Sequence, residues 1–230
     1  MKNTIFYLFL VAVTTSANSV NADQSLIREL RQAEARYGMP DMSLVALSKT
    51  ESSLNWFAIN FDDGASFYPD TKEQALRIIR NVSQRPYIVR ASTNGGTPQV
   101  YFFQTLAAAQ SAVARANRTE GYRVEPHPDG SVVRKLNLLN TGLCAMQLNF
   151  RWQAYKQGRS AKTLLDPKFC IDHAAKFVSG LIKKHGFEKG IGCYYTCGNE
   201  AEARRNRAEY FARYSRQFKR LSKSTSLAQR

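Results

Sequence analysis

The chain has only one long apolar run, and this run lies at the N-terminus. Residues 5–13 are all apolar, Lys2 is the one charge before Asp23, and Val20-Asn21-Ala22 resembles a signal peptidase site. The pattern predicts a cleavable secretory signal peptide over residues 1–22, which is too short to span a membrane as a helix. Since no later segment has enough consecutive apolar residues to cross a bilayer, we expect a periplasmic or secreted protein without a transmembrane segment.

Acidic residues are also scarce, with 18 Asp and Glu against 33 Lys and Arg. This balance favours a polyanionic partner, which could be nucleic acid, acidic lipid or an anionic cell-wall polymer. Export disfavours nucleic acid, so we expect no nucleic-acid partner. The alternative is that the charge only keeps the protein soluble.

Cysteine is absent from the first half of the mature chain, and all four cysteines follow it: Cys144, Cys170, Cys193 and Cys197. In an oxidising compartment an even number predicts two disulfides. The spacings Cys170-x2-His173 and Cys193-x3-Cys197 resemble zinc-ligand spacing, but the residues between them form an amphipathic helical pattern rather than a finger loop. We therefore expect disulfides, with no metal and no cofactor.

The chain lacks internal repeats and low-complexity linkers, which favours one α+β domain over residues 23–230. Two helices are predicted with Ser25 and Asp41 as their N-terminal caps. Further helices are predicted over 71–81 and 105–117, from Asp166-Pro167 to about Gly186, and over about 201–221. The last helix and its tail, residues 201–230, are strongly basic.

Residues 61–135 are predicted to form a β-containing insertion. "PYIVRA" and "QVYFFQ" flank Asn94-Gly95-Gly96, which is typical of a hairpin. "YRVEP" and "SVVRKLNL" flank Pro128-Asp129-Gly130 and predict a second hairpin. Asp62-Asp63-Gly64 is typical of a turn.

One acidic residue stands out because of its position on the second helix. Leu44, Leu47, Ser48 and Glu51 fall at i, i+3, i+4 and i+7, which places Glu51 on the leucine face. Desolvation there would raise the pKa of the carboxyl, whereas a solvated helix end would leave it unchanged. A glutamate that keeps its proton near neutral pH can protonate a glycosidic oxygen, as in lysozyme. Glu51 is therefore the candidate general acid and base.

Four short stretches follow one another in a recognisable order: "TESS" (50–53), "CAMQLN" (144–149), "LLDPKFCI" (164–171) and "GCYYT" (192–196). Together they resemble the soluble lytic transglycosylase (SLT) family, which has a lysozyme-like fold. "Met-Gln-Leu-Asn", "Gly-Cys-Tyr" and Tyr101-Phe102-Phe103 are most similar to the specialised subset associated with type IV secretion and conjugation. The resemblance implies an α+β fold, a mainly helical lysozyme-like domain with a small antiparallel β region.

The resemblance also implies roles for individual residues. Glu51 matches the single catalytic acid/base, and Tyr194 matches the family tyrosine whose hydroxyl points at the catalytic carboxyl; Tyr195 is the weaker candidate. The other implied positions support or line the glycan cleft: Ser52, Met146, Gln147 and Asn149.

Two departures from the family pattern suggest how the cysteines pair. Cys144 stands where the family turn has Gly, and Cys170 stands where the Asp-Pro helix has Asn. Since these positions belong to neighbouring pieces of that fold, the resemblance implies a Cys144–Cys170 disulfide, which leaves Cys193 to pair with Cys197.

The function implied is that of an exported peptidoglycan lytic transglycosylase, which cleaves the MurNAc–GlcNAc β-1,4 bond and forms 1,6-anhydro-MurNAc. Its partners would be peptidoglycan glycan strands and an envelope-spanning secretion or conjugation machine.

A muramidase would need a second carboxylate, for which the sequence offers only Asp62 and Asp63. A non-catalytic wall-binding component is a further alternative. A nucleic-acid or membrane-binding role is disfavoured, because the aromatic residues of the basic helix are spaced to dock it on the domain: Tyr210, Phe211, Tyr214 and Phe218.

Overall fold

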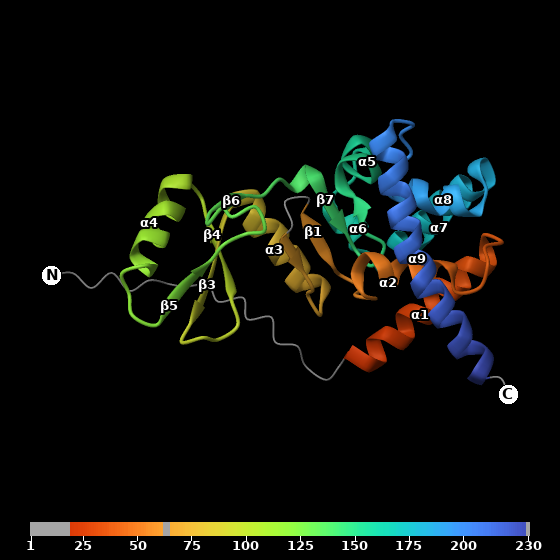
Figure 1. Ribbon diagram of the computed structural model, residues 1–230, viewed down its shortest axis with the longest axis horizontal. Helices are drawn as coiled ribbons and strands as arrows, with labels where there is room; N and C mark the ends of the chain where they lie inside the picture. The colour runs from red at the N-terminus through yellow and green to blue at the C-terminus, as the bar shows by residue number, and fades with distance from the viewer. Residues whose placement is uncertain (1–18, 62–64, 229–230) are drawn as a thin grey trace. The chain divides into compact units, whose positions relative to one another are not determined.

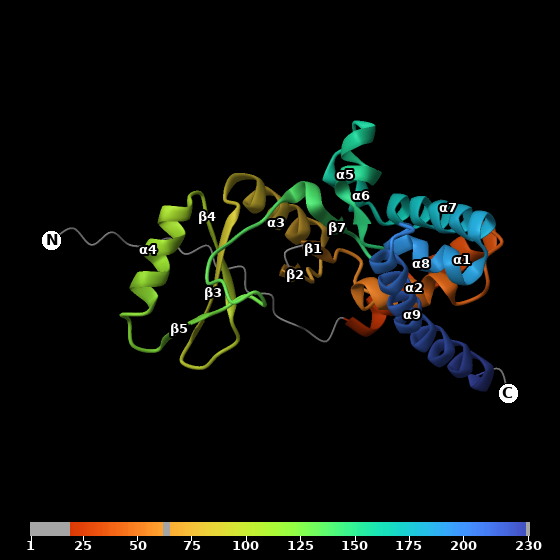
Figure 2. The ribbon, with the colours of Figure 1, turned by 45° about the horizontal axis from the view of Figure 1, so that its top comes forward.

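The computed structural model describes residues 19–61 and 65–228, with side chains from residue 24 to residue 223 (Figures 1 and 2). The predicted signal peptide therefore lies mostly outside the described residues, as do Asp62, Asp63 and Gly64. The fold is α+β, as predicted. Within the described part of the chain, no helix has the length and apolar character needed to cross a membrane.

The described residues divide into two compact units. The smaller contains Phe61, Ala65 and 77–138; the larger contains 19–60, 66–76 and 139–228. Most of the segment 61–135 lies in the smaller unit, but residues 66–76 belong to the larger; that the segment is an insertion stays a prediction. Helix α3 (Lys72–Gln84) contributes residues 72–76 to the larger unit and 77–84 to the smaller. That residues 23–230 form a single domain stays a prediction.

The smaller unit is built around one sheet. Strand β3 (Tyr87–Thr93) pairs antiparallel with β4 (Gln99–Phe103), and Val89 lies opposite Tyr101. The turn between them has positive φ at Asn94 and Gly95, so the first predicted hairpin is confirmed. Helix α4 (Leu106–Ala116) contacts β3, β4 and β5 (Tyr122–Glu125), and therefore covers one face of this sheet (Figure 1).

The second predicted hairpin is wrong. Strands β5 (Tyr122–Glu125) and β6 (Arg134–Lys135) pair with β3 rather than with each other. β5 pairs with residues 90–93 of β3, and β6 with residues 87–88 on the same edge. Because β3 is seven residues long, one edge offers enough amides and carbonyls for two short antiparallel partners in line.

The larger unit is mainly helical. Its helices are α1 (Ser19–Arg36), α2 (Ser43–Ser52), α5 (Phe150–Gln153), α6 (Ala161–Leu164), α7 (Pro167–His185), α8 (Phe187–Tyr195) and α9 (Ala201–Ala228), with short 3₁₀ turns at Leu138–Asn140 and Tyr155–Gln157. A second sheet, whose residues other than Phe61 and Ala65 belong to the larger unit, has the strand order β2-β1-β7-β8. Its strands are β1 (Ile59–Phe61), β2 (Ala65–Phe67), β7 (Thr141–Leu143) and β8 (Leu148–Asn149). The sequence did not predict this sheet, since strands of two or three residues carry no readable alternation.

The basic helix α9 packs against α2 and α8 (Figures 1 and 2). Tyr210 and Tyr214 are buried at this contact, and the rings of Phe187 and Phe218 pack around Tyr214. The aromatic residues of α9 therefore dock the helix, as predicted, while most of its arginines stay exposed.

The helix ends are only partly as predicted. Asp166 caps α7, accepting a hydrogen bond from the Phe169 amide at 3.0 Å. Asp41 does not cap α2, because it pairs with Arg31 at 2.9 Å. The α2 amides donate instead to the buried Glu34 carboxyl of α1: Met42 at 2.8 Å, Leu44 at 2.6 Å and Val45 at 3.1 Å. Helix α1 begins at Ser19, so Ser25 is not its cap either.

We expect Glu34→Ala to lower the free energy of unfolding by about 2 kcal/mol, since it leaves buried amides at the start of α2 without acceptors. Urea unfolding followed by circular dichroism measures the change. Glu34→Gln is the matched control and should lose less, because the amide carbonyl still accepts hydrogen bonds. Equal stability of Glu34→Ala and the parent protein would contradict the capping role.

Candidate active site

Glu51 lies in the last turn of α2, on the face that carries the buried Leu44, Leu47 and Ser48. The predicted placement on the leucine face is therefore confirmed. The helix ends immediately afterwards, because Ser53 and Leu54 both have left-handed backbone conformations, with φ of 57° and 66°. Each costs a non-glycine residue about 1–3 kcal/mol, and strain of this kind is concentrated at functional sites.

The surroundings of Glu51 favour a protonated carboxyl. Burial raises its pKa from 4.5 to about 7, against the opposing effects of a hydrogen bond from the Tyr210 hydroxyl and the positive charge of Arg213. No carboxylate among the described residues contributes to this shift. At neutral pH Glu51 can therefore both give and accept a proton. Asp62 and Asp63, the sequence candidates for a second carboxylate, lie outside the described residues.

Ser52 fastens the end of α2 to the turn that follows β7. Its hydroxyl lies 2.8 Å from the Ala145 carbonyl oxygen and 3.0 Å from that of Ser48. The Ser48 hydroxyl also donates to Ala145, at 3.1 Å, and the Ala145 amide donates to the Trp56 carbonyl, at 3.1 Å. The position of Glu51 is thereby coupled to residues almost a hundred positions further along the chain.

The turn itself depends on two left-handed residues, Cys144 and Gln147, with φ of 67° and 50°. The Gln147 side-chain amide donates to the carbonyls of Ala58, at 3.1 Å, and Cys144, at 3.0 Å. Gly142 leaves the space that this side chain occupies, since a Cβ there would lie 2.5 Å from Gln147 Oε1. The side chain of Gln147 is therefore engaged in holding the turn.

The other two predicted cleft residues have structural contacts as well. The Met146 side chain is fully buried, and Asn149 caps α5 by accepting a hydrogen bond from the Trp152 amide at 3.3 Å. Both residues support the turn next to Glu51, and the Met146 side chain is not available to line an open cleft.

The hydroxyl of Tyr194 donates to the Met146 carbonyl, and not to Glu51 as the resemblance implies. The residue that donates to Glu51 is Tyr210 of α9. Tyr195 stacks on the Tyr210 ring with centroids 5.3 Å apart and keeps 58% of its surface exposed. Tyr194 therefore positions the turn, whereas Tyr195 packs against the tyrosine that holds the carboxyl.

Sequence reasoning missed the role of Tyr210. The spacing of Tyr210 and Tyr214 correctly indicated a docking face on α9, but periodicity does not identify the partner of a hydroxyl group. That partner lies 159 residues earlier in the chain.

Both disulfides have the predicted partners, Cys144 with Cys170 and Cys193 with Cys197, and the protein has no free cysteine. The first joins the turn beside Glu51 to α7. The second closes a short loop around Tyr194 and Tyr195. Both bridges therefore brace segments that contact the site.

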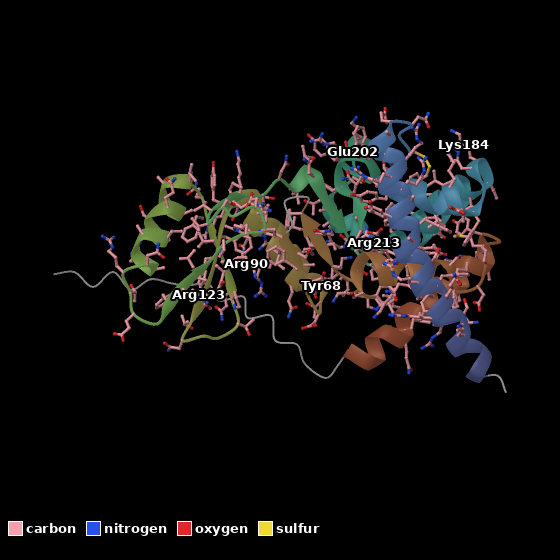
Figure 3. The ribbon with its side chains drawn as sticks, in the orientation of Figure 1. Tyr68, Arg90, Arg123, Lys184, Glu202 and Arg213 are labelled. Atoms are coloured by element: carbon pink, nitrogen blue, oxygen red, sulfur yellow. A yellow bond between two sulfur atoms is a disulfide. The ribbon has the colours of Figure 1, made fainter. Side chains whose placement is uncertain are left out.

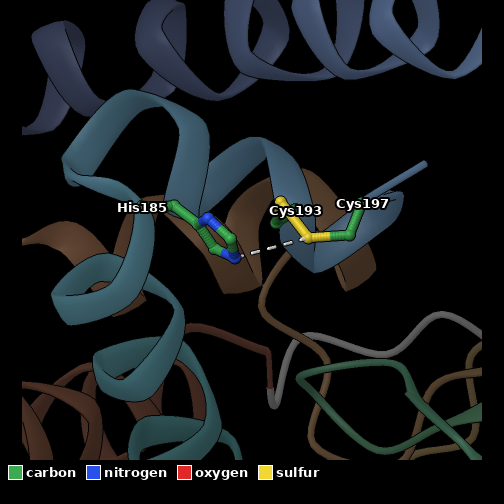
Figure 4. A group of neighbouring side chains, drawn as sticks. All are labelled: His185, Cys193 and Cys197. Carbon is green, nitrogen blue, oxygen red and sulfur yellow. Dashed lines mark hydrogen bonds between the residues drawn. A yellow bond between two sulfur atoms is a disulfide. The ribbon is translucent and has the colours of Figure 1, made fainter. Parts of the chain in front are cut away.

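His185 lies beside the second disulfide, with its Nε2 atom 3.9 Å from Cys197 Sγ (Figure 4). The ligand atoms of His185, Cys193 and Cys197 lie within 4.8 Å of one another. However, zinc is bound by thiolates, and sulfurs joined in a disulfide carry no such charge. In the oxidised protein this group offers a metal only the imidazole. Similarly, Cys170 is in a disulfide and His173 contacts Gln153 Oε1 at 2.8 Å.

The chain matches no protein-family model, no curated protein sequence and no solved structure. Its function therefore has to be inferred from the residues around Glu51. They surround a desolvated carboxyl whose pKa lies near neutrality, and they hold the segments on either side of it by hydrogen bonds and a disulfide.

Proposed function

We propose that the protein is an exported peptidoglycan lytic transglycosylase with a lysozyme-like larger unit. The observation that carries the proposal is Glu51, a helix-end carboxyl with a pKa raised to about 7 and a tyrosine hydroxyl bonded to it. Perturbed carboxyls of this kind concentrate at catalytic sites. The order of the four sequence stretches around it supports the same assignment.

In the proposed reaction, protonated Glu51 donates its proton to the oxygen between MurNAc C1 and GlcNAc C4. The C1–O bond breaks, the GlcNAc hydroxyl leaves, and positive charge develops on the MurNAc ring. The Glu51 carboxylate then removes the proton of the MurNAc 6-hydroxyl, whose oxygen bonds to C1 and closes the 1,6-anhydro ring. Glu51 ends in its starting protonation state and no water is consumed. The hydrogen bond from Tyr210 stabilises the carboxylate between the two proton transfers.

Within the described residues, the absence of a carboxylate acting on Glu51 favours this reaction over hydrolysis. A muramidase uses a second carboxyl group to stabilise the sugar cation, to attack it, or to activate water. Among the residues that the structure describes, none shifts the pKa of Glu51 in the manner of such a partner. A wall-binding component without activity would not require a desolvated glutamate.

The disulfides and the predicted signal peptide support the proposed compartment, and the resemblance supports the proposed partner. The two disulfides fit an oxidising compartment, and the predicted signal peptide over 1–22 would deliver the chain there. The link to an envelope-spanning secretion or conjugation machine rests on the resemblance, including Tyr101-Phe102-Phe103, which lies in β4.

Digestion of purified peptidoglycan in ¹⁸O-labelled water, followed by mass spectrometry, tests the proposal. We expect muropeptides with 1,6-anhydro ends and no incorporated ¹⁸O. Reducing ends carrying ¹⁸O would identify a muramidase instead. Binding to peptidoglycan without any released product would identify a wall-binding component and refute catalysis.

Activity should fall as the pH rises through about 7, because Glu51 must carry a proton to start the reaction. Tyr210→Phe removes a hydrogen bond that favours the charged carboxylate, so it should move this falling limb to higher pH. The pH dependence of kcat/KM on soluble glycan strands measures the shift. Tyr195→Phe, which keeps the stacked ring, is the control and should leave the limb unchanged. A limb at the same pH in Tyr210→Phe would refute the role of this hydroxyl.

A further inference from the structure

Arg213 is an exposed residue of α9, one turn beyond Tyr210 (Figure 3). Its Cζ atom lies 5.6 Å from the centre of the Tyr210 ring, in cation–π contact. Since the hydroxyl of the same ring is bonded to Glu51, Arg213 is held beside the candidate active site.

Arg213 forms no ion pair with the described part of the chain. No described carboxylate lies within ion-pair distance of its guanidinium, although Arg205 on the same helix pairs with Glu209. Arg213 is nevertheless close enough to the site to lower the pKa of both Glu51 and Tyr210.

The charge of Arg213 disfavours the protonated form of Glu51 that begins the reaction. Burial favours a protonated Glu51, whereas a nearby cation favours the carboxylate. A guanidinium held by an aromatic ring, unpaired and exposed next to the acid, is instead suited to bind an anionic group of the substrate. Arginine binds carboxylates with two parallel hydrogen bonds, which fixes their position as well as their charge.

We propose that Arg213 is a specificity determinant that binds a carboxylate on the lactyl arm of the muramic acid residue at the cleavage point. The inference rests on the proposed function. The sugar that loses its C1–O bond carries this arm on C3 of the same ring, so the arm lies close to the bond that Glu51 protonates. The arm ends in a free carboxylate on strands without peptides. On ordinary strands it continues into a stem peptide that has carboxylates of its own.

The test compares Arg213→Gln and Arg213→Lys with Arg220→Gln, a matched control that removes an exposed charge two turns further along α9. Assays at pH 5.5 keep Glu51 protonated in every variant. The substrates are soluble strands with stem peptides and strands stripped of peptides by an amidase. Each is used with free carboxylates and with carboxylates converted to primary amides.

We expect Arg213→Gln to raise KM about 10-fold with little change in kcat, Arg213→Lys to fall between, and Arg220→Gln to match the parent protein. Amidation of the substrate should raise KM for the parent protein and leave Arg213→Gln unaffected. A loss confined to peptide-free strands would assign the contact to the free lactyl carboxylate, and a loss confined to peptide-bearing strands would assign it to a stem carboxylate. A loss on both would show that Arg213 binds whichever carboxylate the arm carries.

An unchanged KM in Arg213→Gln, or an equal loss on free and amidated strands, would overturn the inference alone, provided that the parent protein releases anhydro products. If the parent protein releases none, the proposed function fails and this inference fails with it.

Discussion

Glu51→Gln should lower kcat for the release of anhydro-muropeptides about 10⁴-fold, the upper end of the range for a general acid or base. The upper end applies because one carboxyl would both protonate the leaving oxygen and deprotonate the 6-hydroxyl. Glutamine has nearly the same shape but cannot exchange a proton near neutral pH. Initial rates of anhydro-muropeptide formation by the two proteins measure the loss.

The control for this variant is Glu202→Gln, which removes an exposed carboxylate of α9 (Figure 3) and should keep full activity. Folding is checked separately. The pKa of Glu51 is higher in the folded state than its ordinary 4.5, so the folded protein binds an extra proton and its stability declines as the pH rises from 4.5 to about 7. Glu51→Gln should lack this part of the decline. Retention of a tenth of the activity would rule out Glu51 as the acid/base.

Removing the Cys144–Cys170 disulfide with a Cys144→Ser/Cys170→Ser double variant should lower the free energy of unfolding by about 3 kcal/mol. The bridge spans 26 residues, and without it the unfolded chain gains the corresponding freedom. It also holds the turn to which Ser48 and Ser52 are bonded, so activity should fall together with stability. Urea unfolding and the rate of anhydro-muropeptide release, measured on the same samples, test both effects.

A second double variant separates the bridge from the backbone conformation. Cys144→Gly/Cys170→Ser should be about 1 kcal/mol more stable than the serine pair, since glycine adopts the left-handed conformation of residue 144 without steric cost. The Cys193–Cys197 bridge closes a loop between residues only four positions apart, so Cys193→Ser/Cys197→Ser should lower the free energy of unfolding by about 2 kcal/mol. Unfolding of the Cys144→Ser/Cys170→Ser protein at the urea concentration of the parent would show that the turn does not depend on the bridge.

Local patterns in the sequence were sufficient for several features of this protein. The i, i+3, i+4, i+7 spacing correctly placed Glu51 on the leucine face of α2, and Asp166-Pro167 correctly marked the start of α7. The Asn94-Gly95 turn correctly joined β3 to β4. These features succeed because they depend on residues within one or two turns of a helix, or across one hairpin.

Features that depend on a choice among distant partners could not be predicted from local patterns in the sequence. Asp41 had the right position to cap α2, yet the buried Glu34 of α1 supplies the acceptor. β5 and β6 had the right turn between them, yet both pair with β3. In each case two partners satisfy the same local rule, and packing selects one of them.

The candidate site shows both situations in one place. The sequence by itself determined that Glu51 would share a face of α2 with Leu44 and Leu47, because helical periodicity fixes which residues of a helix lie in line. Only the tertiary structure decided that Tyr210 of α9, and not Tyr194, donates the hydrogen bond to its carboxyl. Tyr210 is buried and Tyr194 is half-buried near Glu51. Which hydroxyl reaches the carboxyl depends on how α9 packs against α2 and α8, a geometry that no local pattern encodes.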